Sequence, residues 1–226
     1  MMNNPLYRIE EKVLELFMKE NFHEATDLCK ILYESATKIN SSYFQAASQG
    51  TMGYILFEEG KYSEAIEKIL LTISISTEGY RSFIDTGHLA LCYSKLNNLD
   101  KALFFVNKAV AAAEKENHLG AQYEWYNFKG NIFFKMKEFE EAHFWVDKSI
   151  FIAQKMNKNS NDFFYQSYLT KYEILLQQGQ IDQAKILDKQ LNSFFNSIND
   201  PILHIRRDKL KYLNLYENYL STNLKL

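Results

Sequence analysis

The side chains that most often perform chemistry are scattered along this sequence, and they form no recognised catalytic motif. The sequence has no P-loop, no dinucleotide-binding fingerprint and no nucleophile elbow. Its five histidines show neither an HExxH motif nor a close pair, so the converging ligands of a metal site are not indicated. They are His23, His88, His118, His143 and His204. We therefore expect no enzymatic activity, no metal and no cofactor.

The cysteines and carboxylates support the same expectation. Cys29 and Cys92 are far apart in the sequence and match no metal-binding or redox spacing. We interpret both as small buried apolar side chains, with a disulfide or a reactive thiol as the alternative. Carboxylates are abundant, but most fall in predicted turns or on predicted outer helix faces, as Glu140 and Glu141 do.

Amide and ammonium side chains between residues 127 and 135 offer a different kind of chemistry. Asn127, Asn131 and Lys135 follow one another at intervals of four residues, so on an α-helix they would share one face. An amide can hydrogen-bond to a peptide backbone, and an ammonium can pair with an acid. Such a strip would present hydrogen-bonding and charged groups side by side. The alternative is that the lysine is simply solvated, as exposed lysines usually are.

Helices must hold these side chains, because apolar residues recur along the chain at intervals of three and four. One short phrase, a bulky residue followed by two variable residues and alanine, occurs five times after a short polar turn. Its alanines are separated by 40, 37, 40 and 42 residues and are Ala25, Ala65, Ala102, Ala142 and Ala184. The sequence therefore predicts a helix–turn–helix unit that is repeated five times.

Small residues are predicted where the two helices of a unit cross. The alanine of each phrase would occupy this crossing on the second helix, where only a small side chain fits. Gly53 and Gly130 would do the same on the first helix. These are close-packing arguments, since even one additional methylene group is felt in a densely packed interior.

Two of these segments resemble the tetratricopeptide repeat (TPR), whose helix pairs stack into a superhelix. They are residues 53–65, GYILFEEGKYSEA, and residues 130–142, GNIFFKMKEFEEA. The third repeat is also similar, whereas the first and fifth keep only the turn, the bulky residue and the alanine. The resemblance implies an all-α fold, an α-α superhelix of five TPR-like helix pairs.

We predict a single repeat domain over residues 1–226. Its helix pairs are predicted at residues 6–40, 42–78, 80–117, 119–158 and 160–198. A capping helix is predicted at residues 201–223, where it would cover the apolar face left at the end of the stack. The alternative is a dimerisation helix that makes a homodimer, because Tyr212, Leu215 and Tyr219 add apolar surface away from the predicted core-facing side.

The TPR resemblance also implies a binding face, because the first helix of each pair lines a concave groove in such proteins. The ligand-facing position directly after the first-helix glycine holds Leu14, Tyr54, Leu91, Asn131 and Glu173. The position four residues later holds Met18, Glu58, Lys95, Lys135 and Gln177. In relatives that clamp a peptide carboxylate, Asn and Lys occupy these positions, and this chain has part of that set. The candidate peptide-binding residues are Lys95, Asn127, Asn131, Lys135, His88, Tyr54 and Leu91.

The repeats are several residues longer than the family period of about 34. In this they are similar to bacterial peptide-pheromone receptors of the Rap and PlcR type, which carry an N-terminal effector part. Because the repeats begin almost at once here, we expect no such effector. Three functions remain open: a protein- or peptide-binding adaptor, an intracellular receptor for a short signalling peptide, and a structural subunit that assembles through its C-terminal helix.

The bulk composition narrows the partners. The formal net charge is −2, so the chain lacks the overall cationic excess that neutralises nucleic-acid phosphates. The first residues have no basic region followed by an apolar stretch, and no apolar run is long enough to cross a bilayer. We therefore expect a cytoplasmic protein with a protein or peptide partner, and neither nucleic acid nor membrane.

Overall fold

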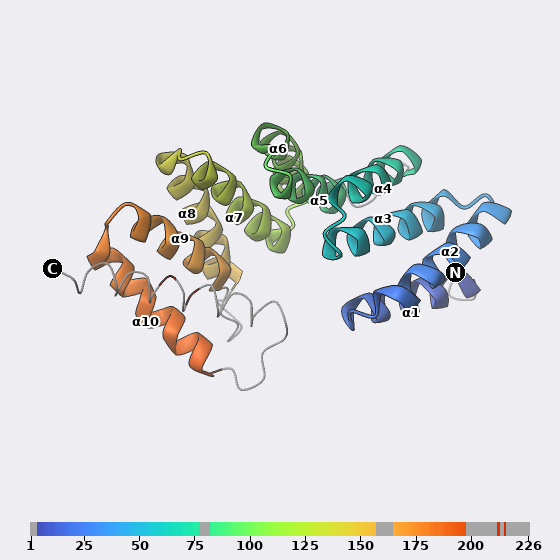
Figure 1. The fold of residues 1–226 in the computed structure, drawn as a ribbon, viewed down its shortest axis with the longest axis horizontal. Coiled ribbons are helices and arrows are strands. Elements are labelled where there is room, and N and C mark those ends of the chain that lie inside the picture. Colours follow the sequence, from blue (N-terminus) through green and yellow to red (C-terminus); the bar gives the residue numbers. More distant parts are fainter. Residues whose placement is uncertain (1–3, 77–81, 157–164, 198–211, 213–214, 216–226) are drawn as a thin grey trace. The chain divides into compact units, whose positions relative to one another are not determined.

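The computed structural model describes residues 4–76, 82–156, 165–197, 212 and 215, and these residues form five consecutive helix pairs and no strand (Figure 1). This confirms the predicted all-α fold of five TPR-like pairs. None of the helices described combines the length and the apolar character needed to span a membrane. The pairs are α1 (Pro5–Met18) with α2 (Phe22–Lys38), α3 (Ser42–Glu58) with α4 (Tyr62–Ile75), α5 (Ser82–Lys95) with α6 (Leu99–Lys115), α7 (Leu119–Lys135) with α8 (Phe139–Met156), and α9 (Tyr165–Gln177) with α10 (Ile181–Ser197).

The chain divides into two compact units, residues 1–116 with α1–α6 and residues 117–226 with α7–α10. Within each unit the first helices of neighbouring pairs contact one another: α1 with α3, α3 with α5, and α7 with α9. The second helices of neighbouring pairs make no comparable contact in the described part of the chain. Because the first helices lie closer together, each unit curves with its first helices on the inner side. The single domain over residues 1–226 stays a prediction.

The turn inside every pair has the same backbone geometry. Its middle residue has a positive φ, between 58° and 78°, at Glu20, Gly60, Asn97, Lys137 and Gly179. After each of them a backbone N–H donates to the carbonyl five residues earlier, as Lys61 does to Leu56 at 2.8 Å. This is the Schellman arrangement, which satisfies carbonyls at the end of the first helix and reverses the chain.

The predicted close crossings are present in the structure. The five alanines of the repeated phrase are at most 1% exposed. A Cβ atom added to Gly130 would lie 2.5 Å from Val146 Cγ2 and 3.1 Å from the Ala142 carbonyl oxygen, and one added to Gly53 would lie 2.7 Å from Ile69 Cγ1. A side chain at either glycine would therefore separate the two helices of its pair, which confirms the role predicted for these glycines.

Buried hydroxyl groups connect neighbouring pairs. Ser149 on α8 donates from Oγ to the Tyr123 carbonyl at 2.7 Å, and its Oγ lies 2.6 Å from Ser167 Oγ on α9. In the first unit, Ser48 Oγ donates to the Cys29 carbonyl at 2.7 Å. Each of these serines is fully buried, so the hydrogen bond offsets the cost of removing the hydroxyl from water.

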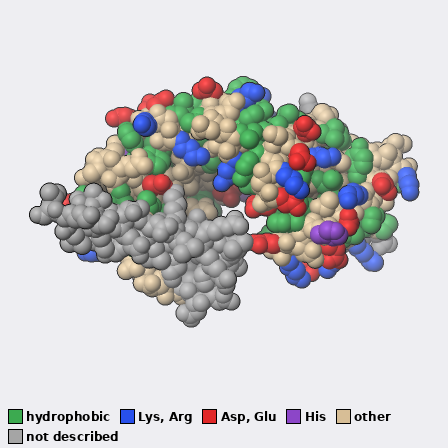
Figure 2. Space-filling view, in the orientation of Figure 1, with side chains coloured by type: hydrophobic (Ala, Val, Ile, Leu, Met, Phe, Trp, Pro, Cys, Tyr) green, Lys and Arg blue, Asp and Glu red, His purple; other side chains and the backbone are tan. Residues whose placement is uncertain are grey.

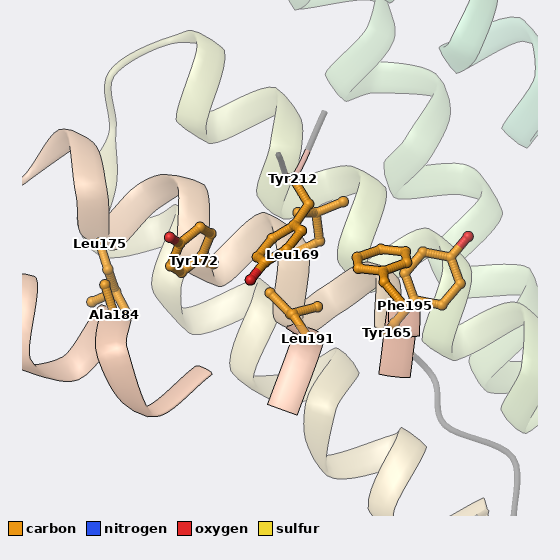
Figure 3. Close-up of a cluster of buried hydrophobic side chains, with 8 residues drawn as sticks. All are labelled: Tyr165, Leu169, Tyr172, Leu175, Ala184, Leu191, Phe195 and Tyr212. Carbon is orange, nitrogen blue, oxygen red and sulfur yellow. The ribbon is translucent and has the colours of Figure 1, made fainter. Parts of the chain in front are cut away.

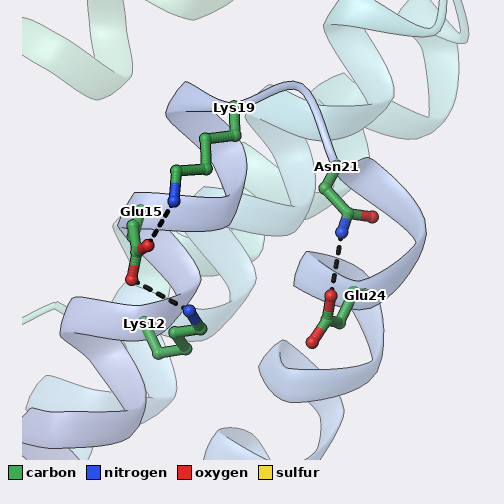
Figure 4. Close-up of polar contacts among 5 residues, drawn as sticks. All are labelled: Lys12, Glu15, Lys19, Asn21 and Glu24. Carbon is green, nitrogen blue, oxygen red and sulfur yellow. Dashed lines mark hydrogen bonds and ion pairs between the residues drawn. The ribbon is translucent and has the colours of Figure 1, made fainter.

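Charged and polar side chains form ion pairs and a hydrogen bond on the surface of the first pair (Figure 4). Glu15 on α1 pairs with Lys12 at 3.0 Å and with Lys19 at 2.6 Å. The two ammonium groups lower the pKa of Glu15 to about 2. At the beginning of α2, Asn21 Nδ2 donates to Glu24 Oε2 at 2.8 Å, which holds the turn residue against the first helical turn.

The fifth pair packs its core against two residues of the C-terminal segment. Tyr212 is 3% exposed and lies against the rings of Tyr172 and Phe195 (Figure 3). Its hydroxyl donates to Asp188 on α10 at 2.7 Å. Leu215 packs on the same cluster. Tyr212 and Leu215 therefore contribute to the core of their own unit, and the expectation that they add apolar surface away from it is wrong. The alternative of a dimerisation helix stays a prediction. Apart from these two residues, the predicted capping helix 201–223 lies outside the described residues.

Candidate ligand-binding faces

In the second unit, three of the predicted binding residues lie along one face of α7. Asn127 and Asn131 are half-buried, and Lys135 is exposed at the end of the helix. Asn131 Nδ2 donates to Thr170 Oγ1 on α9 at 3.1 Å and to the Asn127 carbonyl at 3.3 Å. Asn131 therefore joins the two inner helices of this unit while remaining on their shared face.

The hydrogen bonds of Asn131 define what it can still offer. Thr170 Oγ1 donates its own proton to the Gln166 carbonyl at 3.1 Å, so it acts as an acceptor toward Asn131. The Asn127 carbonyl can only accept. Both contacts therefore fix the amide nitrogen of Asn131 as the group that faces them, and both of its protons are used. The amide oxygen, Oδ1, makes no hydrogen bond with any described residue.

In the first unit, Tyr54 and His88 come together between α3 and α5. Their rings stack with centroids 4.0 Å apart. The Tyr54 hydroxyl donates to Oδ1 of Asp85 at 2.5 Å, and Phe57 meets the His88 ring edge-on at 6.3 Å. Tyr54 is only 8% exposed, so it holds two neighbouring inner helices together and presents little of its ring to a ligand.

His88 is a neutral side chain in this setting. Burial within the ring stack lowers its pKa to about 4, although a hydrogen bond with the Ile84 carbonyl opposes this shift. That bond joins Nδ1 to the carbonyl oxygen at 2.9 Å, so Nδ1 carries the proton and Nε2 is left as an acceptor. His88 therefore contributes a ring and a hydrogen-bond acceptor, and no charge, at neutral pH.

The remaining predicted residues of the first unit lie on α5. Leu91 is half-buried, and Lys95 is exposed and has no ion-pair partner in the part of the chain that the structure describes. On the same predicted positions of α1, Leu14 is 38% and Met18 is 79% exposed. The inner side of the first unit therefore combines apolar surface on α1 with a cationic end on α5.

Sequence reasoning missed Asp85 and Thr170, which anchor Tyr54 and Asn131. Both lie on the following first helix, at sequence separations of 31 and 39 residues. The sequence did contain a signal that Asp85 is buried. Asp85 lies four and seven residues before Leu89 and Cys92, so helical spacing places it on the same buried face of α5. Nothing in the sequence distinguishes Thr170 from an exposed threonine.

The two cysteines lie in the core of the first unit. Cys29 and Cys92 are free and buried, and burial raises the pKa of each thiol to about 12. This confirms their interpretation as small core residues.

No group of three or more His, Cys, Asp or Glu side chains among the described residues could hold a metal ion. Acidic and basic side chains are interspersed over the face drawn in Figure 2.

Comparison with known proteins agrees with the repeat geometry. Residues 87–116, which contain the end of α5 and all of α6, match the family model described as tetratricopeptide repeat. The sequence has no match among curated proteins. The segment that matches is the third of the five helix pairs, and its helices, turn and alanine crossing recur in the other four.

Solved structures of TPR-type proteins share this fold. BtubC (BKLC) from P. vanneervenii has a TM-score of 0.73 at 14% identity, covering 87% of this chain and 83% of its own. Bacillus thuringiensis PlcR, in complex with the peptide PapR7 and DNA, has a TM-score of 0.72 at 16% identity, covering 92% and 74%. The Podosopora anserina putative kinesin light chain with nearly identical TPR-like repeats has a TM-score of 0.63 at 18% identity, covering 93% and 98%. The predicted resemblance to TPR proteins, including the PlcR type, is confirmed at the level of the fold.

Proposed function

We propose that this protein is a TPR-type adaptor that binds a peptide or an extended protein segment along the inner faces of its first helices. The observation that supports this best is the α7 strip, defined as Asn127, Asn131 and Lys135. Neighbouring first helices form the inner side of each unit, and this side presents both hydrogen-bonding and charged groups. An inner side of this kind suits an elongated ligand.

The chemistry of the strip favours a peptide backbone. Asn131 is held rigidly by Thr170, so its orientation is fixed before a ligand arrives. Its oxygen makes no hydrogen bond with any described residue, so it can accept a hydrogen bond from a backbone N–H group of a ligand. Lys135 lies one turn further along α7, where its ammonium can bind a carbonyl or a carboxylate. A peptide presents these donor and acceptor groups alternately along its length.

Partner capture with a double variant tests this assignment. The protein with Asn131→Ala and Lys135→Ala is used as bait in native lysate, and recovered partners are quantified by mass spectrometry. We expect a loss of partners that the unmodified protein recovers, because both the amide oxygen and the ammonium are removed.

The matched control changes the same two residue types on second helices of the same unit. Asn196→Ala and Lys155→Ala remove an exposed amide from α10 and an exposed ammonium from α8, and this variant should recover partners normally. Losing the hydrogen bonds of Asn131 costs roughly 1 kcal/mol of stability, so the melting temperature of each bait must be measured. If both variants, still folded, recover the same partners in the same amounts as the unmodified protein, the α7 strip is not the binding face.

A second candidate function is reception of a short signalling peptide. It is favoured by the likeness to PlcR, whose structure contains the peptide PapR7, and by the long repeats of this chain. A ligand that binds only the folded state raises the melting temperature. A thermal-shift screen against short secreted peptides should therefore give stabilising hits that the Asn131→Ala, Lys135→Ala variant loses.

A further inference from the structure

Lys148 on α8 has an unusual set of helical neighbours. The side chains three and four residues away on an α-helix are the ones that a lysine can reach. For Lys148 these are all apolar: Phe144, Trp145, Phe151 and Ile152. None of the positions three or four residues away on α8 therefore carries a carboxylate that could pair with its ammonium group.

The structure confirms this environment. Lys148 Nζ lies 4.6 Å from the ring centroid of Trp145, 4.8 Å from that of Tyr126 and 5.4 Å from that of Phe144. Lys129 Nζ lies 3.5 Å from the same Trp145 ring. Aromatic faces attract cations, so these rings gather two ammonium groups at one place on the surface of the second unit.

Two large rings beside these cations are exposed to solvent. Phe144 is 57% exposed and Phe151 is 65% exposed. They are seven residues apart on one helix, which is two turns or about 10 Å along the axis. Together with Trp145 and Lys148 they form a surface that we call the α8 strip, which is apolar at both ends and cationic in the middle.

None of the carboxylates that the structure describes pairs with the ammonium group in the middle of this strip. Lys148 makes no ion pair with any residue that the structure describes. Asp147, its neighbour in sequence, points to another element and pairs with Lys171 on α9. By contrast, Lys12, Lys19, Lys30 and Lys61 all pair with carboxylates on their own or neighbouring turns.

We propose that the α8 strip is a second interaction surface, and that it binds an amphipathic helix of a partner protein that carries a carboxylate within its apolar face. The carboxylate would pair with Lys148, and apolar side chains on either side would cover Phe144 and Phe151. This surface lies on a second helix, so it is separate from the inner-side site proposed above and does not depend on it.

An anionic membrane surface fits the strip less well. Glu140, Glu141 and Asp147 are exposed on the same helix, and an anionic lipid surface would repel all three. A single carboxylate placed opposite Lys148 avoids them, because it approaches only the middle of the strip.

Fluorescence anisotropy with two labelled helical peptides tests the proposal. Both peptides have a leucine face; one carries glutamate within that face, and the other carries glutamine at the same positions. We expect the full-length protein to bind the glutamate peptide about fivefold or more tightly than the glutamine peptide, and added salt should reduce this preference. Equal affinity for the two peptides, or no binding of either, would overturn the proposal.

Variants locate the interaction. Lys148→Met keeps an apolar stem of similar length and should remove the preference for glutamate, whereas Lys189→Met, at an exposed site on α10, should keep it. Phe144→Ser with Phe151→Ser should weaken both peptides, whereas Ile186→Ser, at a 64% exposed site on α10, should weaken neither. Binding that survives the phenylalanine variant would also overturn the proposal, as would binding to phosphatidylglycerol vesicles without binding to the glutamate peptide.

Discussion

Single methyl groups decide how closely the helices of a pair approach. At Gly130 an added Cβ would meet both the Val146 side chain and backbone atoms of α8, at 2.5 Å and 3.1–3.2 Å. At Gly53 the closest atom, at 2.7 Å, belongs to the Ile69 side chain, and the nearest backbone atom is 3.4 Å away. A side chain can adjust its rotamer, but a helix backbone must move as a whole. The two sites therefore differ in how well they tolerate a methyl group.

We predict a graded effect of alanine at three helical glycines. Gly130→Ala should lower the free energy of unfolding by about 1–3 kcal/mol, since overpacking outweighs the better helix propensity of alanine. Gly53→Ala should cost less. Gly120→Ala is the control, because its new Cβ would meet only the His118 ring, at 3.4 Å, and it should be neutral or slightly stabilising. Urea denaturation measures the free energy of unfolding of the three variants. A Gly130→Ala variant as stable as Gly120→Ala would contradict the predicted order.

His88 should make the stability of the protein depend on pH. Its pKa falls from an ordinary value of 6.5 to about 4 in the folded state, so the unfolded chain binds a proton that the folded chain does not. His88 therefore does not lower the free energy of unfolding above pH 6.5, where it is neutral in both states. As the pH falls from 6.5 to about 4, protonation of the unfolded chain lowers the free energy of unfolding. The slope in this window is at most about 1.4 kcal/mol per pH unit.

Denaturation at several pH values, with His88→Phe as the test variant, checks this assignment. Phenylalanine keeps a ring against Tyr54 but cannot be protonated, so the slope between pH 6.5 and 4 should become shallower. His23→Phe, at an exposed site on α2, controls for the added phenylalanine. Acidic groups such as Glu15, whose pKa is lowered to about 2, act at lower pH. An unchanged slope in His88→Phe would show that another group is responsible.

At the scale of the elements, the turn inside each of the five pairs contains one residue in the left-handed backbone conformation. Only two of these five residues are glycine. Glu20, Asn97 and Lys137 adopt a positive φ, which costs a residue with a Cβ roughly 1–2 kcal/mol. Asparagine tolerates this conformation best of the three. The glutamate and lysine turns therefore hold strain that the packing of their pairs overcomes.

Glycine substitution at these turns should stabilise the protein. We predict that Lys137→Gly raises the free energy of unfolding by up to about 1 kcal/mol, since the relief of strain exceeds the added entropy of the unfolded chain. Gly179→Ala should have the opposite sign. No atom lies within 4 Å of a Cβ added at Gly179. Any decrease in the free energy of unfolding of Gly179→Ala is therefore due to backbone strain and not to a steric clash. Thermal melting measures both, and a destabilised Lys137→Gly would mean that the lysine side chain stabilises the turn in another way.

The elements were predictable because their signals are local. The alanine phrase, the polar turn and the glycines at the crossings recur at a fixed register, so five pairs could be located to within a few residues. The site was less predictable because its contacts cross from one pair to the next. Tyr54 follows a first-helix glycine, as a ligand-facing residue should, yet Asp85 and His88 from the next pair engage it. Asn131 is likewise tied to Thr170, a partner that only tertiary packing selects.

At the scale of the whole molecule, the end of the helix stack must be closed. The fifth pair has Tyr172 where Gly53 and Gly130 lie in other pairs, and this larger side chain is 2% exposed. The Tyr212 ring lies against it, and the Tyr212 hydroxyl donates to Asp188 on α10. Tyr212 and Leu215 therefore belong to the core of the second unit, although helical spacing suggested that they faced elsewhere.

Removing this ring should loosen one unit and leave the other unchanged. We predict that Tyr212→Ala costs about 3–5 kcal/mol, the range for large aromatic truncations in a core, whereas Tyr212→Phe loses only the hydrogen bond and costs about 1 kcal/mol. Hydrogen exchange measured by mass spectrometry should show faster exchange in α9 and α10 of Tyr212→Ala, and unchanged exchange in α1–α4. If light scattering instead shows a dimer that Tyr212→Ala converts to an equally stable monomer, Tyr212 serves a subunit interface and not the closure of its own stack.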